Sequence, residues 1–279
     1  MLNYKYKLDG GSLTSIMVSN EERLFILDES IWSGQDNVIF PFVARLKNEK
    51  YMVDGKEYSM KIHGIAKYSN FKLVAKSENS DTIYLTSNAE TLKRYPYKFE
   101  LYVTYTRNNN ILKVEYKVKN IDDKIMYFGI GGHPAIRVNY ENNDTKGNYV
   151  LFDKKTLITY YELNDDDGSF ITRKKTLGEV EKIEVDKAFF RKYKTLICDN
   201  NFNHLTLKRK DGRRISFRFH SKYLSIWSKP NAGDFVCIEP WDGLPDFEKP
   251  NLELSKKEGI NSLKSGEEYL FSYEMEFID

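Results

Sequence analysis

The chain has 279 residues, of which 41% are hydrophobic and 14% aromatic, with 20 Tyr and 17 Phe against 3 Trp. This composition excludes a disordered chain and favours strand-rich structure, and we expect one domain over residues 1–279 because β-sandwiches reach roughly 200–250 residues as a single unit. The 43 Lys and Arg residues balance 41 Asp and Glu residues to a net charge of +2, which argues against nucleic acid or an anionic membrane as a partner.

The two cysteines, Cys198 and Cys237, are too few for a disulfide framework or for a cysteine-based zinc site. No run approaches the roughly 18 apolar residues of a membrane span, and residues 1–17 lack the apolar segment of a signal peptide. We therefore expect a reduced, cytoplasmic setting and no membrane partner.

The N-terminal part of the chain is typical of short strands joined by polar turns. Residues 23–27 form a strand-like apolar run, and residues 51–60 contain Asp54-Gly55 between two such runs, which predicts a β-hairpin. The apolar run 38–46 contains Arg45 near its end. A long cation there needs a partner or a ligand, unless it emerges into solvent at a strand end.

Two histidines follow strand-like runs. His63 lies beside Gly64 just past a strand, where a structural role competes with a catalytic one. His133 lies in Gly131-Gly132-His133-Pro134, between two apolar runs. Glycine allows close approach or positive φ and proline forbids a ladder hydrogen bond, so we expect the strand to break there. Such a break either presents His133 as a site residue or makes it the cap of a bulged turn.

Alternating polarity predicts two long hairpins, over residues 101–118 and 204–220. Strands that recur at short intervals, without helical patterns between them, favour an all-β fold in the form of a large antiparallel β-sandwich. A short helix leading into a strand is expected over residues 189–197. The basic residues of the second hairpin indicate a solvent face, because no stacking aromatic residues interleave with them.

Two later segments carry carboxylates. The acidic run 164–168 lacks the spaced ligands and terminal glutamate of an EF-hand, so we interpret it as a solvated turn. Glu239 ends an apolar strand and is followed by Pro240-Trp241. Its carboxylate should lie where the strand leaves the sheet, partly desolvated and with a raised proton affinity. Trp241 would suit the apolar face of a sugar.

Three ionisable residues therefore stand out, namely His63, His133 and Glu239, with Arg45 and Lys67 as cationic helpers. Two imidazoles and a carboxylate suit proton transfer between oxygens near neutral pH. The sequence contains no Gly-x-Ser-x-Gly motif, no Walker glycine pattern and no histidines at metal-ligand spacing. Among these classes of site, the sequence therefore favours one for acid–base chemistry over one built on a nucleophile, a phosphate loop or a metal.

In their order along the chain, these motifs resemble the galactose mutarotase-like superfamily and, within it, the LacX-like branch of the aldose 1-epimerases. The resemblance rests on Trp32-Ser33-Gly34, Phe40-Pro41 with Arg45-Leu46, His63-Gly64-Ile65-Ala66-Lys67, Gly132-His133-Pro134 and Cys237-Ile238-Glu239-Pro240-Trp241-Asp242-Gly243. It implies a supersandwich of antiparallel strands with a sugar cleft on a concave face. It also implies an isomerase that interconverts the α and β anomers of a hexose without a cofactor.

The resemblance implies roles for individual residues. Glu239 matches the base that takes the proton from the C1 hydroxyl, His133 the acid that protonates the ring oxygen, and His63 the histidine that hydrogen-bonds near that oxygen. Arg45 is similar to the arginine that holds sugar hydroxyls, with Lys67 and Trp241 as further sugar-binding residues.

Two positions depart from the family pattern, with Lys67 where arginine is usual and Ala44 where glycine is usual. Lysine is a point donor rather than a planar fork, which leaves hydroxyl or phosphate recognition there open. For the aspartate that binds substrate hydroxyls, Asp234 is the one candidate. Three alternatives stay open: a sugar-binding protein without turnover, an epimerase acting on a sugar phosphate held by Lys67 or Arg45, and a glycoside hydrolase using Glu239 with Asp242 or Asp246.

Overall fold

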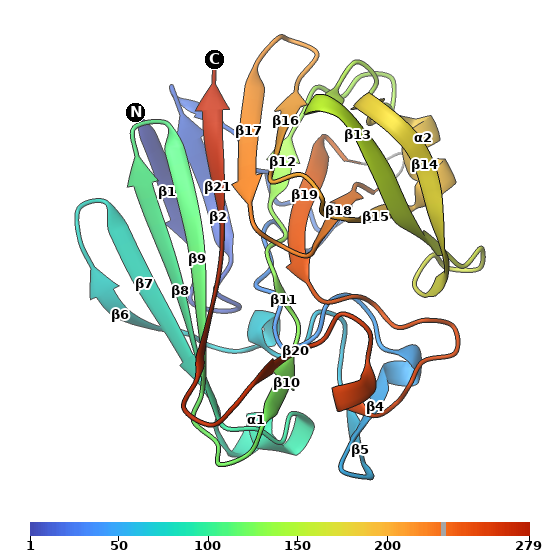
Figure 1. The fold of residues 1–279 in the computed structure, drawn as a ribbon. Helices are drawn as coiled ribbons and strands as arrows, with labels where there is room; N and C mark the ends of the chain where they lie inside the picture. The colour runs from blue at the N-terminus through green and yellow to red at the C-terminus, as the bar shows by residue number, and fades with distance from the viewer. Residues whose placement is uncertain (230–232) are drawn as a thin grey trace.

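The computed structural model describes residues 1–229 and 233–279 (Figure 1). In this part of the chain one antiparallel sheet contains 14 strands, in the order β11-β19-β18-β15-β13-β16-β17-β21-β9-β8-β7-β6, with β12 paired to β19 and β14 paired to β13. Smaller sheets join β1-β2-β3, β10-β20 and β4-β5. The predicted all-β fold, a large antiparallel β-sandwich, is confirmed.

The strands have the following bounds: β1 Leu2–Tyr6, β2 Leu13–Val18, β3 Glu21–Glu22, β4 Lys50–Val53, β5 Lys56–Ser59, β6 Lys72–Lys76, β7 Ser80–Thr86, β8 Phe99–Asn108, β9 Ile111–Asn120, β10 Met126–Phe128, β11 Ile130–Gly131, β12 Ala135–Arg137, β13 Tyr149–Leu163, β14 Ile171–Glu184, β15 Thr195–Asp199, β16 His204–Lys208, β17 Arg214–Phe219, β18 Tyr223–Trp227, β19 Phe235–Asp242, β20 Asn261–Leu263 and β21 Glu268–Ile278. The α-helices are α1 Ala89–Arg94 and α2 Lys187–Tyr193. Short 3-10 turns lie at Lys47–Glu49, Ala66–Tyr68 and Leu254–Lys256.

The elements with strong local patterns form where the sequence predicts them. The β8–β9 and β16–β17 hairpins match the two predicted hairpins, and β4–β5 turns at Asp54-Gly55. Burial alternates along β8 and β9, because one face of each strand packs on the core while the other meets solvent. The predicted helix and strand near residue 190 are α2 and β15.

The predicted strand over residues 23–27 is wrong. Strand β3 ends at Glu22, and residues 23–27 pair through an isolated bridge from Leu24 to Ile136, with hydrogen bonds from the Phe25 N–H to the Ala135 carbonyl and from the Arg137 N–H to the Arg23 carbonyl, both at 2.8 Å. Arg23, Leu24 and Phe25 are buried, whereas Ile26 and Leu27 are about half exposed, so the run buries three consecutive residues instead of alternating. An apolar run that crosses a sheet edge looks like a strand in sequence, since composition does not encode its pairing partner.

The main core is formed by buried residues of the 14-stranded sheet together with those of the small β1–β3 sheet. The small sheet contacts the large one through β1 and β8 (Figure 1). All eight residues of β19 are buried, because β11, β12 and β18 flank it and other elements cover both of its faces. Among residues 1–229 and 233–279, no helix is long and apolar enough to cross a membrane.

Candidate active site

The register of β19 brings a histidine opposite a glutamate. Both β11 and β12 pair with β19, through Gly131–Trp241 and Ala135–Cys237 respectively. His133 lies midway between the two pairing points, so the antiparallel register sets it opposite Glu239. The strand is interrupted between β11 and β12, as the glycines and the proline predict.

Residues 35 and 36 replace the missing ladder partners at this break. The carbonyl of Gln35 accepts a hydrogen bond from the Ala135 N–H at 2.9 Å, and the Asp36 carboxylate accepts one from the His133 N–H at 3.1 Å. Asp36 is only 2% exposed. Burial raises its pKa to about 7, although the hydrogen bond from the His133 backbone opposes that shift. Asp36 therefore supports the backbone of His133 from the buried side.

The two glycines before His133 are required because neighbouring side chains lie too close for a Cβ, and not because the backbone has a positive φ. A Cβ at Gly131 would lie 2.5 Å from Cδ1 of Trp241, and a Cβ at Gly132 would overlap Cε1 of Tyr273 and lie 2.7 Å from its hydroxyl. Any larger side chain at residue 132 must displace the Tyr273 ring, which lies in the core beneath the site.

We expect Gly132→Ala to destabilise the protein by about 1–3 kcal/mol, because the added methyl overpacks this contact. Gly129→Ala is the matched control, since its Cβ would come no closer than 3.2 Å to a neighbouring atom. Urea unfolding of both variants measures the difference. Equal costs at the two positions would contradict the close-approach explanation.

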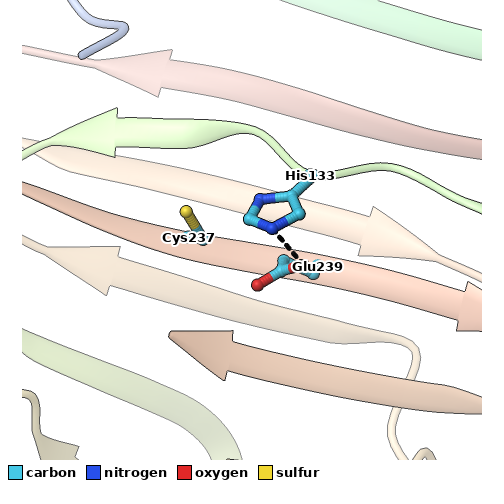
Figure 2. A group of neighbouring side chains, drawn as sticks. All are labelled: His133, Cys237 and Glu239. Carbon is cyan, nitrogen blue, oxygen red and sulfur yellow. Dashed lines mark ion pairs between the residues drawn. The ribbon is translucent and has the colours of Figure 1, made fainter. Parts of the chain in front are cut away.

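His133 and Glu239 form a buried pair. Nε2 of His133 lies 3.1 Å from Oε2 of Glu239, and Ser225 Oγ donates to the other carboxylate oxygen at 3.4 Å (Figure 2). Burial lowers the pKa of His133 to about 3, with a contribution from Lys67, and raises the pKa of Glu239 well above its ordinary value. Both shifts favour the uncharged state of the pair, in which Glu239 carries the proton and His133 is neutral.

His63 contacts His133 edge to face, with ring centroids 5.2 Å apart. The Ala44 N–H donates to Nδ1 of His63 at 3.3 Å, which assigns the ring hydrogen to Nε2 and makes that atom a donor. Burial, with charge from His133, Lys67 and Arg45, lowers the pKa of His63 well below its usual value and keeps it neutral. Ala44 has a φ of +51°, in the left-handed region that favours glycine.

These side chains line one cavity of about 560 Å³, a size in the range of small-molecule sites. The structure brings together all six site residues predicted from the sequence: His63, His133, Glu239, Arg45, Lys67 and Trp241. They come from loops before β4 and β6, from the β11–β12 break and from β19, and are therefore distant in sequence.

The aromatic side chains around the cavity are arranged differently from the exposed Trp241 surface that the sequence suggests. Trp241 is only 2% exposed, so it forms the floor of the cavity rather than a surface platform. Trp32 is half-buried, and its indole stacks on the His133 imidazole at 5.1 Å with 30° between planes. Trp227 meets the same imidazole edge-on at 5.8 Å. Trp32 contacts Gly34, where a Cβ would lie 2.7 Å from Cε2 of the indole.

Two cations, Lys67 and Arg45, face the cavity, and the charge of Arg45 acts on Asp167, which borders the same cavity. Lys67 is partly buried, and burial together with Arg45 lowers its pKa. Within the described part of the chain, neither Lys67 nor Arg45 has a carboxylate at salt-bridge distance. The Arg45 loop is held by Asp246, whose N–H donates to the Arg45 carbonyl at 3.0 Å and whose carboxylate pairs with buried Lys257.

The candidate aspartate Asp234 is wrong, because it pairs with Arg137 at 2.8 Å and lines a different hollow of the surface. The acidic run 164–168 forms the solvated turn that we predicted, with residues 165–167 exposed, and Asp167 in addition borders the cavity. Its loop folds back through Asn164, whose side chain accepts hydrogen bonds from the N–H groups of residues 169 and 170. A sequence pattern does not reveal which way such a loop folds.

The glycoside hydrolase alternative requires a second carboxylate beside Glu239, but both candidates, Asp242 and Asp246, are bound to other residues. Asp242 accepts hydrogen bonds from the Lys222 N–H at 2.5 Å and from the Tyr269 hydroxyl, and Asp246 pairs with Lys257. Neither aspartate lines the cavity. The structure therefore gives no support to a hydrolase built on Glu239 with either of them.

The comparisons with known proteins agree with this geometry. The family model of the aldose 1-epimerases matches residues 4–276. Protein LacX (plasmid) of Lactococcus lactis subsp. lactis is 29% identical over 255 residues, covering 87% of this chain and 85% of that protein. The X-ray structure of the galactose mutarotase related enzyme from Lactobacillus acidophilus has a TM-score of 0.93 at 28% identity, covering 100% of this chain and 95% of that one. A galactose mutarotase-like protein from Lactobacillus casei shares the fold, with a TM-score of 0.92 at 24% identity over 99% of this chain and 97% of that one.

Proposed function

The chain belongs to the aldose 1-epimerase family, and from that premise we propose that it interconverts the α and β anomers of a free hexose by opening and reclosing the sugar ring. Family membership and the galactose mutarotase-like fold support a sugar epimerase, an isomerase in reaction class. The hexose and the roles of individual residues are our proposal. It requires no cofactor, because the acid and the base are both side chains.

One observation carries the proposal, namely the buried His133–Glu239 pair at 3.1 Å that opens onto a cavity of sugar size. Mutarotation moves one proton off the C1 hydroxyl and one onto the ring oxygen. These two oxygens share the same carbon, so a base and an acid must lie side by side. A pair that holds one proton between two adjacent groups meets this need.

In the proposed reaction the proton that rests on Glu239 first passes to His133, which leaves Glu239 as a carboxylate. Glu239 takes the C1 hydroxyl proton while His133 protonates the ring oxygen, and the bond between C1 and the ring oxygen breaks to give the open-chain aldehyde. Rotation about the C1–C2 bond presents the other face of the carbonyl. Reclosure reverses both proton transfers and restores the pair.

The surrounding residues support this reaction by binding and orientation. The Nε2–H of neutral His63 is a donor suited to the ring oxygen, where negative charge develops before protonation. Arg45 and Lys67 offer donors to sugar hydroxyls, and the indoles of Trp32 and Trp241 offer apolar surface to the sugar ring.

Polarimetry of freshly dissolved α-glucose and α-galactose tests the proposal. We expect the native protein to accelerate relaxation to the anomeric equilibrium, and His133→Ala to lose roughly a hundredfold or more of that acceleration, since the ring oxygen loses its acid. His220→Ala is the matched control, because His220 is exposed and lies outside the cavity.

Acceleration that survives in His133→Ala would contradict the assigned role. Calorimetric sugar binding by a native protein that accelerates neither sugar would instead favour the non-catalytic carbohydrate-binding alternative. The two readouts separate a wrong residue assignment from a wrong activity.

A second candidate substrate is a sugar phosphate, and the two unpaired cations favour it. Arg45 and Lys67 both line the cavity with no carboxylate at salt-bridge distance among the described residues, and a phosphate would satisfy both. If this alternative holds, kcat/KM for glucose 6-phosphate exceeds that for glucose by at least about tenfold, and Lys67→Gln removes most of the difference. For a free-hexose epimerase, the phosphate gives no advantage and Lys67→Gln changes the two rates together. Parallel stopped-flow measurements on both substrates decide between the two.

A further inference from the structure

A third side chain joins the buried pair. Cys237 and Glu239 are two residues apart on β19, so their side chains point to the same face of the strand. The ligand atoms of His133, Cys237 and Glu239 all lie within 4.8 Å of one another (Figure 2). Cys237 is a free, fully buried cysteine and takes no part in the proposed proton transfers.

This donor set matches a metal of intermediate softness. Imidazole nitrogen, thiolate sulfur and carboxylate oxygen are the three ligand types that zinc accepts, at about 2.0–2.3 Å. Tetrahedral coordination at these lengths separates the donors by roughly 3.3–3.8 Å. The His133 and Glu239 donors, at 3.1 Å, are already near that separation, and the sulfur needs a shift of about 1 Å at most. Two cysteines are too few for a cysteine-based site, but a mixed site needs only one.

Two buried polar atoms of the His133–Glu239 pair have unsatisfied hydrogen-bonding capacity. In the described part of the chain, Oε2 of Glu239 and Nδ1 of His133 are buried and have no hydrogen-bond partner. The Oε2 atom lies near Nε2 of His133 but without the alignment of a hydrogen bond. Buried polar atoms are rarely left in this state unless a ligand or catalysis uses them. The cavity side of the pair would leave the fourth coordination position open to water or solute.

We propose that His133, Cys237 and Glu239 form an inhibitory site for Zn²⁺ or a similar borderline metal ion. Binding places the metal between the three side chains, and the thiol proton and the proton shared by the pair pass to solvent. The thiolate and carboxylate then neutralise the charge of the ion, which removes the penalty of burying it. Because the metal takes up both the acid and the base, bound metal and proton transfer exclude each other. The inhibition rests on the proposed function, whereas the binding does not.

Metal binding is measured first, with no activity required. Isothermal titration of the apo protein with Zn²⁺ should give one site per chain, and Cys237→Ala should weaken it by at least about tenfold. Co²⁺ should give a thiolate-to-metal charge-transfer band that is absent in Cys237→Ala, and Mg²⁺ should not bind. The surface pair His204–Asp153, at 2.7 Å, is a competing site, so His204→Ala serves as the control and should keep the titration and the band.

Inhibition is measured second, by polarimetry with and without Zn²⁺. The native protein should lose its acceleration at one equivalent of zinc, while Cys237→Ala should keep its basal rate and resist zinc. Stoichiometric binding that survives in Cys237→Ala, or that vanishes in His204→Ala, would overturn the site. Zinc bound through Cys237 without inhibition would overturn its placement on the pair. A protein with no mutarotase activity would leave the titration as the decisive measurement.

Discussion

The Glu239→Gln protein is expected to lose nearly all acceleration of mutarotation, by about 10²–10⁴-fold relative to the native protein. Glutamine has the shape of glutamate, but its amide oxygen cannot take the proton of the C1 hydroxyl. Ser225 Oγ can still donate to that oxygen, as it does to Oε1 of the native carboxylate at 3.4 Å, so the packing around the residue is retained. Polarimetry on α-glucose and α-galactose, with the uncatalysed rate subtracted, measures the loss.

The matched control is Glu248→Gln, which changes an exposed glutamate outside the cavity. The pH profile gives a second readout. Burial raises the pKa of Glu239, so the pair should keep its shared proton, and the native rate should fall on the alkaline side only at a pH well above the range of an ordinary carboxyl. A Glu239→Gln protein as fast as the native one would contradict the mechanism, and a rate that already falls with rising pH near pH 5 would show that the catalytic proton is held by an ordinary carboxyl rather than by the pair.

The sequence predicts the parts of this fold that are specified locally. The β4–β5 hairpin follows from Asp54-Gly55, and β8–β9 follows from ten-residue runs of alternating polarity. The strand break at His133 follows from glycine and proline, whose backbone limits hold in any tertiary setting. The candidate residues were found because the site uses unusual residues at strand ends, where charge and glycine interrupt apolar runs.

The rest of the site depends on contacts between distant segments, and a local pattern does not encode them. Asp36 lies in a polar stretch and shows its role only when the backbone N–H of His133, 97 positions away, donates a hydrogen bond to its carboxylate. Asp167 enters the cavity because its loop folds toward the Arg45 loop, while Asp234 leaves it to pair with Arg137. The Trp32-Ser33-Gly34 motif gives no local sign that the Trp32 indole stacks on the His133 ring. Each of these positions depends on how segments distant in sequence pack against one another.

Asp36→Asn is expected to make the protein more stable at pH 8, and the gain should shrink toward pH 4. The folded pKa of Asp36 is about 7, against about 3.9 for an unfolded aspartate, so between these values the native state holds a proton that the unfolded state has released. Native stability therefore falls as pH rises from about 4 to about 7, by up to about 4 kcal/mol, and stays low above pH 7. Asparagine carries no such proton, and its side-chain oxygen can still accept the hydrogen bond from the His133 N–H. Urea unfolding at several pH values, followed by tryptophan fluorescence, gives the difference directly.

Exposed Asp165→Asn is the control and should leave stability unchanged within about 0.5 kcal/mol at every pH. A constant difference between Asp36→Asn and the native protein would show that Asp36 does not titrate in this range. The same variant should also shift the activity, because charge on Asp36 raises the pKa of Glu239. Asp36 is charged only above about pH 7, so in the variant the alkaline limb of the rate profile should move to lower pH while the rate at its plateau is retained. A lost plateau would instead mean that the Asp36 charge, and not only its oxygen, holds His133 in place.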